Sequence, residues 1–447
     1  MTGVRVEEVE RETIALLEQL CRQPSVSAEG AALAETADLV ESLLRESGFE
    51  TRRLHADAGP PAVWGERRGR SDWTLLLYNH YDVQPVDPIE LWDSPPFEPT
   101  IRDGKLYARG TSDNKAQIAM RLATIRALGD DLPVTVRWIV EGEEEVASPN
   151  FDGIVAVHAD LLRADGCLWE GGGLLSDGRP ELTLGVKGVL GVRLDVELLS
   201  SDAHSGAAAV VPNAAWRLLE ALATLRDPAG RVSVDGFHDA VREPTAEQRR
   251  AVAEQSPTAD DELRAAFGVE TFLDGVEGEA LRDRLTFAPT ANIAGFHSGY
   301  SGPGIKTVTP ARASAWLDFR LVPDQRPGEV LGLLRAHLDR RGFDDVEITV
   351  LATADAAATS PDDPFVRRAI AVAARVAGRP ASISPIAAGS LPVVASLARH
   401  VGVPGLSAPD NPVYFGTAAH APNEHIRLED IAPAVRYLLG LLDELGS

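Results

Sequence analysis

The sequence predicts a two-domain α/β protein in which the second domain is inserted into the first. A chain of 447 residues is too long for the single core of about 100 to 200 residues that is typical of one domain. Short apolar runs typical of strands alternate with segments of helical periodicity along most of the chain. Residues 353–364, rich in Ala, Asp, Thr, Ser and Pro, are typical of a linker that returns to the first domain.

We expect residues 1–186 and 355–447 to form the first domain, around a central mixed sheet, and residues 187–354 to form an inserted α/β sandwich. The inserted domain should contain a long alternating strand at 189–199, a helix at 213–225, an acidic and largely helical insertion at 235–288, strands at 291–296, 313–321 and 346–351, and a helix at 328–341. A helix at 365–377 then returns to the first domain.

The composition is that of an ordinary globular protein, with 44% hydrophobic and 25% charged residues. No apolar run approaches the roughly 20 residues that cross a bilayer, and the acidic, amphipathic N-terminus lacks the apolar core of an export signal. We therefore expect a cytoplasmic protein without a membrane partner. A net charge of −24 argues against binding to nucleic acid. Cys21 and Cys167 lie far apart in the sequence, so we expect buried free thiols.

The first domain should begin with two helices, because residues 6–47 carry helical periodicity twice, with a loop at 22–30 between them. An apolar run at 73–78 is then typical of a buried strand, and helical spacing returns at 115–128. The Pro-rich segment 85–99 lacks a regular pattern and is expected to line a site.

Three strand-like runs each end in side chains that can bind a metal ion. The run at 73–78 leads into Asn79-His80-Tyr81-Asp82, an alternating run at 134–140 leads into Glu141-Gly142-Glu143-Glu144-Glu145, and a run at 167–169 stops at Glu170. Ligands of an open α/β sheet gather beyond the carboxyl ends of its strands. We therefore expect these side chains in one site, together with Asp113 at the start of a helix and His420 near the C-terminus.

The candidate residues are His80, Asp82, Asp113, Glu144, Glu145, Glu170 and His420. Imidazoles mixed with carboxylates, without thiolates, suit a catalytic site for Zn²⁺, and also for Mn²⁺ or Co²⁺. Five ligands are too many for one tetrahedral ion but suit two ions about 3.5 to 4 Å apart that share a bridging carboxylate. Such a pair lowers the pKa of a bridging water and polarises a carbonyl. Of two adjacent glutamates, one can then bind metal while the other takes the proton of the water.

Each of these signals also has a simpler interpretation. A His followed two residues later by Asp is common by chance, Asp113 can simply cap its helix, and an acidic run such as 143–145 is usually a solvated face. Gly171-Gly172-Gly173 resembles a phosphate-binding loop, but no Lys-Ser/Thr pair follows it. The placement of candidate ligands at three separate strand ends favours the metal site over these alternatives.

The chain resembles, through five motifs in the same order and spacing, the dinuclear zinc peptidases that include glutamate carboxypeptidase, carnosine dipeptidase and the aminoacylases. The motifs are NHYDVQP, ARGTSDNK, EGEEEVAS, SDAHSG and AHAPNE. The resemblance covers nearly the whole chain and implies that His80, Asp113 and Glu170 hold one Zn²⁺. It implies that Asp113, Glu145 and His420 hold the other, so that Asp113 bridges the two ions.

The same resemblance implies roles for three further residues. Glu144 would be the general base, and Asp82 would orient His80 by a hydrogen bond. The inserted domain would serve as a lid and a dimerisation domain of a homodimer. His204, in the SDAHSG motif, would reach the site of the neighbouring subunit and stabilise the tetrahedral oxyanion there.

The resemblance also implies contacts with the substrate. Arg320 would bind its free carboxylate, with Lys306 and Asn292 in neighbouring segments of the same domain, and Ser390 would be the polar contact of the loop at 387–392. Two positions depart from the family pattern, since Ala388 and Ala147 stand where Gly is usual. We expect both changes to reshape the substrate pocket.

We therefore expect hydrolysis of an amide bond next to a free carboxylate, by a dipeptidase or short-peptide carboxypeptidase. The alternative activity is that of an N-acyl amino acid amidohydrolase or deacylase, which uses the same metals and the same carboxylate contact. A catalytically silent binding protein on this scaffold is the competing class, and the intact ligand set and Glu144 argue against it.

Overall fold

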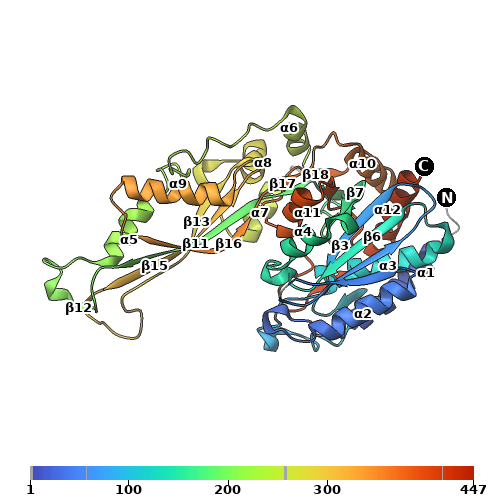
Figure 1. The fold of residues 1–447 in the computed structure, drawn as a ribbon, viewed down its shortest axis with the longest axis horizontal. Coiled ribbons are helices and arrows are strands. Elements are labelled where there is room, and N and C mark those ends of the chain that lie inside the picture. Colours follow the sequence, from blue (N-terminus) through green and yellow to red (C-terminus); the bar gives the residue numbers. More distant parts are fainter. Residues whose placement is uncertain (1–3, 57, 256–258, 415) are drawn as a thin grey trace.

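The computed structural model describes residues 4–56, 58–255, 259–414 and 416–447. They form two lobes, and the larger one holds both ends of the chain (Figure 1). Its centre is a six-stranded sheet in the order β1-β2-β6-β3-β7-β19. The strands are β1 Glu50–Leu54, β2 Ala62–Arg67, β6 Thr135–Glu141, β3 Thr74–His80, β7 Gly166–Leu168 and β19 Gly405–Leu406. β3 pairs in parallel with both β6 and β7, whereas β2 pairs antiparallel with β1 and β6. The predicted mixed sheet is confirmed.

Helices cover both faces of this sheet because the side chains of each strand alternate between two apolar cores. Leu75 and Leu77 of β3 join the core with helices on one face, whereas Leu76 and Tyr78 join the core on the other. The first face carries α1 Val6–Cys21, α2 Leu33–Glu46, α3 Ala116–Leu128, α10 Pro364–Ala377 and α12 Ile431–Leu445, and the second carries α4 Phe151–Leu162 and α11 Pro392–His400. Cys21 and Cys167 are buried free thiols, as expected.

The small lobe is a four-stranded antiparallel sheet in the order β13-β15-β11-β16. Its strands are β13 Thr290–Ser298, β15 Arg312–Leu321, β11 Gly188–Glu197 and β16 Glu347–Ala354, and helices α5 Ala214–Ala223 and α9 Pro327–Arg340 cover one face. Alternate residues of β11, from Leu190 to Val196, supply its core. The predicted α/β fold class with two domains is confirmed.

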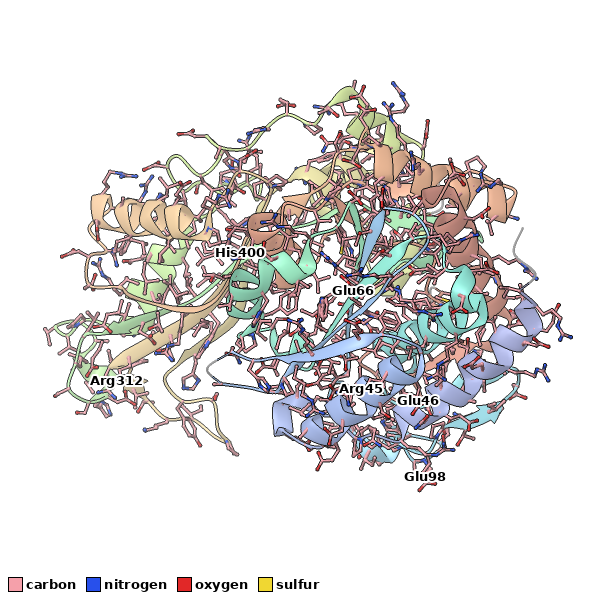
Figure 2. The ribbon with its side chains drawn as sticks, turned by 45° about the vertical axis from the view of Figure 1, so that its right-hand side comes forward. Arg45, Glu46, Glu66, Glu98, Arg312 and His400 are labelled. Atoms are coloured by element: carbon pink, nitrogen blue, oxygen red, sulfur yellow. The ribbon has the colours of Figure 1, made fainter. Side chains whose placement is uncertain are left out.

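β15 runs from the outer end of the small lobe towards the large lobe. Arg312, at the start of this strand, lies at the outer end of the small lobe in Figure 2, whereas His400 at the end of α11 lies on the large lobe. Residues near the end of β15 therefore approach the large lobe.

The segment at 353–364 is not the simple linker that its composition predicts. β16 continues to Ala354, and β17 Ala357–Ala358 pairs antiparallel with β10 Gly185–Val186. The two crossings between the lobes thus lie side by side as paired strands. Small residues permit this pairing, because Gly185 closely approaches the backbone of Ala357.

The insertion at 235–288 is only partly helical, with α6 Ala246–Ala253, α7 Ala259–Phe267 and α8 Gly278–Phe287, and residues 256–258 lie outside the described ranges. It packs on the large lobe although its range falls within the predicted inserted domain. Gln255 Nε2 donates to the carbonyl of Ile383 at 3.1 Å, and Arg179 Nη1 donates to the carbonyl of Glu254 at 2.9 Å. These partners belong to a small sheet, β18 Ser382–Ser384, β9 Pro180–Thr183 and β8 Gly173–Leu174, or to its turn.

No helix of the described residues is long and apolar enough to cross a membrane.

A fully buried ion pair connects α3 to the strand ends of the large lobe. Arg121 Nε donates to Asp410 Oδ2 at 2.7 Å, and both side chains are completely buried. The same guanidinium donates to the carbonyls of Tyr78 at 2.9 Å and Trp169 at 3.2 Å, at the ends of β3 and β7. Arg121 therefore fixes the spacing of two strand ends that the sequence predicts to carry metal ligands.

Asp410→Ala should lower the free energy of unfolding by about 3 to 5 kcal/mol, because it leaves the guanidinium of Arg121 buried without its counter-charge. The matched control is Glu444→Ala, which removes an exposed partner of Arg375 at 3.1 Å and should cost at most about 1 kcal/mol. Urea unfolding measures both changes. Equal losses in the two variants would contradict the structural role of the buried pair.

Candidate metal centre

The parallel strands β6, β3 and β7 bring three groups of predicted ligands to one edge of the central sheet. His80 is the last residue of β3 and is completely buried. Glu144 and Glu145 follow β6 in a short 3₁₀ turn, and Glu170 follows β7. This is the edge at which open α/β sheets bind their ligands.

Asp113 reaches the same place from the turn that precedes α3, and this turn is fixed by Glu424. The Glu424 carboxylate accepts hydrogen bonds from the backbone N–H groups of Gly110 at 2.9 Å, Ser112 at 2.8 Å and Asp113 at 3.1 Å. Arg109 Nη1 donates to the same carboxylate at 2.7 Å, and both of these side chains are buried. The backbone of Asp113 is therefore held by a charge-assisted network rather than by the helix alone.

The two oxygens of the Asp113 carboxylate face two different groups of ligands. Oδ1 lies 3.0 Å from His80 Nε2, which is also 3.0 Å from Glu170 Oε2. Oδ2 lies 3.0 Å from His420 Nε2, which is also 3.2 Å from Glu145 Oε2. Each group offers three ligand atoms within 4.8 Å of one another. This arrangement can hold two metal ions with Asp113 between them.

The chemistry of the donors fits divalent cations. Four carboxylates meet two imidazoles in a largely buried space, and burial together with the neighbouring carboxylate of Glu170 raises the pKa of Glu144 to about 9. Hydrogen bonds to Asp113 and Glu145 raise the pKa of His420 to about 10. Clustered acids of this kind are unfavourable without cations, and mixed imidazole and carboxylate donors suit Zn²⁺, Mn²⁺ or Co²⁺.

Asp82 connects the ligand of β3 to the glutamates of β6. Its Oδ1 lies 3.2 Å from His80 Nδ1, on the side of the ring away from Asp113. Oδ1 also accepts a hydrogen bond from the backbone N–H of Glu144 at 3.3 Å, and Oδ2 accepts one from the backbone N–H of Glu145 at 3.1 Å. A single buried carboxylate thus orients both the imidazole and the glutamate turn.

The three adjacent glutamates differ in their surroundings. Both oxygens of Glu143 accept hydrogen bonds from the Asn150 amide, at 3.0 and 2.9 Å, which turns this residue away from the ligand groups. Glu145 accepts a hydrogen bond from Gln84 Nε2 at 2.9 Å and lies beside His420. Glu144 Oε2 lies 4.0 Å from His80 Nε2, beside the ligands without a shorter contact to the ring.

Three of the predicted substrate contacts meet near the junction of the lobes. Arg320, one residue before the end of β15, donates from Nη1 to Ser390 Oγ at 3.0 Å and from Nε to Asp318 Oδ1 at 3.3 Å. Asn292 Nδ2 donates to the other oxygen of Asp318 at 3.0 Å. Burial and the charge of Arg320 lower the pKa of the nearby Lys187 to about 8. Two basic side chains, Arg320 and Lys187, and one carboxylate, Asp318, therefore meet at this position.

His204 and Lys306 are not brought to this position. His204 belongs to β12 Ala203–His204, which pairs with β14 Val308–Thr309 at the outer end of the small lobe (Figure 1). Lys306 Nζ lies 3.8 Å from Asp202 Oδ2 beside this pair of strands. Both residues are therefore remote from the metal ligands of their own chain.

The interpretation of the sequence missed several residues that hold the site together. Asn114 Nδ2 donates to Glu170 Oε2, and Asn79 Nδ2 donates to Asn114 Oδ1 at 3.2 Å. Gln84 and Glu424 lie within the motifs NHYDVQP and AHAPNE, but nothing in the motifs assigned them a role. Their position inside those motifs was the one signal that could have found them.

Comparisons with known proteins find similar sequences and structures. Residues 76–444 match the model of Peptidase family M20/M25/M40. An M20 family metallo-carboxypeptidase from Sulfolobus solfataricus has 37% sequence identity and a TM-score of 0.91, over 97% of this chain and 99% of that one. The Beta-Ala-His dipeptidase of Rattus norvegicus is 30% identical over 62% of this chain and 58% of its own length. A Cys-Gly metallodipeptidase of Schizosaccharomyces pombe is 29% identical over 74% of this chain and 73% of its own.

The match to the family model covers most of the chain, and the resemblance predicted from the five motifs is confirmed. The predicted enzyme class, a metal-dependent peptidase, is also that of the named relatives. The chain therefore belongs to peptidase family M20/M25/M40.

Proposed function

We propose that this protein hydrolyses the amide bond next to a free carboxylate in dipeptides or other short peptides. The observation that carries the proposal is the Asp113 carboxylate, whose oxygens each lie 3.0 Å from a different histidine. The names of the relatives, two dipeptidases and a carboxypeptidase, support this substrate class. An N-acyl amino acid carries the same amide and carboxylate, so deacylation is the alternative activity.

In this proposal His80, Asp113 and Glu170 hold one divalent ion, and Asp113, Glu145 and His420 hold the other. Zn²⁺ is the ion that the donor set suits best, with Mn²⁺ or Co²⁺ as alternatives. Such a pair, when bound, lowers the pKa of a shared water and polarises the substrate carbonyl. Asp82 keeps the His80 ring oriented.

Glu144 is the proposed general base. Its neighbour Glu145 lies 3.2 Å from His420 and is thereby assigned to the ligands, whereas Glu144 lies beside both ligand groups. Glu144 would take a proton from the attacking water and deliver it to the amide nitrogen as the bond breaks.

The free carboxylate of the substrate would bind Arg320, with Asn292 and Ser390 beside it. A guanidinium offers two parallel donors to a carboxylate, and Nη1 of Arg320 already contacts Ser390 on loop 387–392. We assign this position to the C-terminal residue of the substrate. In the proposed domain division, Arg320 comes from the inserted domain of residues 187–354 and Ser390 from the domain of residues 1–186 and 355–447.

His204 is proposed to act in the site of a partner subunit, in a two-fold homodimer. β12 lies at the outer end of the small lobe, away from the ligands of its own chain (Figure 1). An isologous dimer would send each His204 to the other site, where its ring would stabilise the developing oxyanion. Lys306, which lies beside the same strands, would accompany it.

Glu144→Gln should lower kcat by about 10² to 10⁴, because the amide cannot accept the proton of the water, and should leave the metal content unchanged. Glu143→Gln is the matched control, since its side chain is bound to Asn150, and it should retain near wild-type kcat. Steady-state kinetics with elemental analysis checks both. Wild-type turnover in Glu144→Gln would remove this residue from the mechanism.

A panel of dipeptides, N-acyl amino acids and their C-terminal amides, assayed with Zn²⁺, Mn²⁺ and Co²⁺, tests the substrate class. Dipeptides should be hydrolysed fastest, and amidation should raise KM strongly in the wild type because Arg320 loses its anionic partner. The same amidation should change KM little in Arg320→Ala. Equal sensitivity in both proteins would place the carboxylate elsewhere, and preference for the N-acyl amino acids would favour the alternative activity.

Mixing His204→Ala with Glu144→Ala under conditions that exchange subunits should restore activity from two inactive parents. In a hybrid dimer, one site receives an intact His204 and keeps its own Glu144, while the other site carries both defects. Native mass spectrometry verifies that hybrids form. A mixture that stays inactive although hybrids are present would show that His204 does not act across the dimer.

A further inference from the structure

A cavity of about 220 Å³ is lined by α7 and α8, by the small sheet β18-β9-β8 and by loop 387–392. Its wall includes Glu181 of β9, Ser382 and Ser384 of β18, Thr286 of α8 and Ala388 of the loop. The two helices belong to the insertion at 235–288, which the proposed function does not use. The loop contributes one of the two alanines that replace a glycine of the family pattern.

Glu181 is the unexplained group in this cavity. Its side chain is half-buried, and no hydrogen bond or ion pair engages its carboxylate within residues 4–56, 58–255, 259–414 and 416–447. Burial raises the pKa of Glu181, and no neighbouring charge offsets that effect. A carboxylate withdrawn from water without a partner is unfavourable. A ligand of opposite charge would relieve this.

The other charged groups of the wall already have partners. Glu262 accepts a hydrogen bond from Ser176 Oγ at 2.7 Å. Arg282 lies 3.4 Å from Asp260 and donates to a backbone carbonyl. Glu181 therefore leaves the cavity with an uncompensated negative charge, and the nearby hydroxyls of Ser and Thr offer further acceptors. This chemistry suits an ammonium or guanidinium group, which only donates hydrogen bonds.

Ala388 connects the cavity to the proposed carboxylate position. It lines the cavity, and Ser390, two residues further along the same loop, accepts a hydrogen bond from Arg320 Nη1 at 3.0 Å. Two residues span at most about 7 Å of chain, which is comparable with the length of an extended Lys or Arg side chain. The cavity wall at Ala388 and the contact of Ser390 with Arg320 are therefore separated by no more than the length of one such side chain.

We propose that this cavity is a specificity pocket for a basic side chain on the C-terminal residue of the substrate, with Glu181 as the counter-charge. The assignment rests on the proposed function, because it takes Arg320 as the anchor of the substrate carboxylate. It gives the insertion at 235–288 a role, since α7 and α8 line the same cavity as Glu181.

Hydrolysis of Ala-Arg and Ala-citrulline tests the pocket, because citrulline matches arginine in shape but carries no charge. The wild type should prefer Ala-Arg by about tenfold to a hundredfold in kcat/KM, and Glu181→Gln should make the two substrates equivalent. Glu279→Gln, an exposed acid on α8, removes the same charge nearby and should keep the wild-type preference. The inference is overturned if the wild type shows no preference, if Glu181→Gln retains it, or if the preference belongs to Arg-Ala instead.

Thermal shifts with free L-arginine and L-citrulline separate the pocket from the proposed function, because they need no turnover. Arginine should raise the Tm of the wild type more than citrulline does, and this difference should vanish in Glu181→Gln. If no dipeptide, including Ala-Arg and Ala-citrulline, is hydrolysed but arginine still stabilises the protein through Glu181, the proposed function fails and the pocket stands. Equal hydrolysis and equal thermal shifts would remove the pocket and leave the proposed function.

Discussion

The Asp113 carboxylate, with one oxygen directed at His80 and the other at His420, is the constraint on which the site depends. The two histidines come from the end of β3 and from a loop near the C-terminus, so this one side chain joins distant parts of the chain. Its position is fixed by the Glu424 carboxylate, which accepts hydrogen bonds from three backbone N–H groups of the same turn. Because His420 and Glu424 both belong to the C-terminal segment, the complete arrangement requires that segment in its place.

Buried polar side chains hold the ligands in place around this carboxylate. Asp82 orients His80 and the glutamate turn together, and Arg121 binds the carbonyls at the ends of β3 and β7. Buried charges are unfavourable unless fully partnered, and here each has several partners. This network stabilises the position of the site more than the sheet alone could, because loops rather than strands carry Glu144, Glu145 and His420.

The sequence predicted the strands well, because apolar runs are local signals, and the structure brings the candidate ligands at their ends close together. The approach of the two lobes was harder to foresee. The strand pairing between 185–186 and 357–358 could not be predicted, because these short runs of small residues carry no recognisable strand pattern. The docking of 235–288 on the large lobe depends on contacts with β18 and β9, which are distant in the sequence. Glu424 and Asp410 were missed for the same reason, since their partners lie hundreds of residues away.

Metal content tests the shared carboxylate most directly. The wild-type protein, reconstituted with Zn²⁺ and freed of loosely bound ions, should hold about two equivalents per chain. His420→Ala should retain about one of these, because His80 and Glu170 remain, whereas Asp113→Ala should lose both ions together. Circular dichroism verifies that each variant is folded. Retention of one full equivalent by folded Asp113→Ala would contradict a carboxylate shared between two ions.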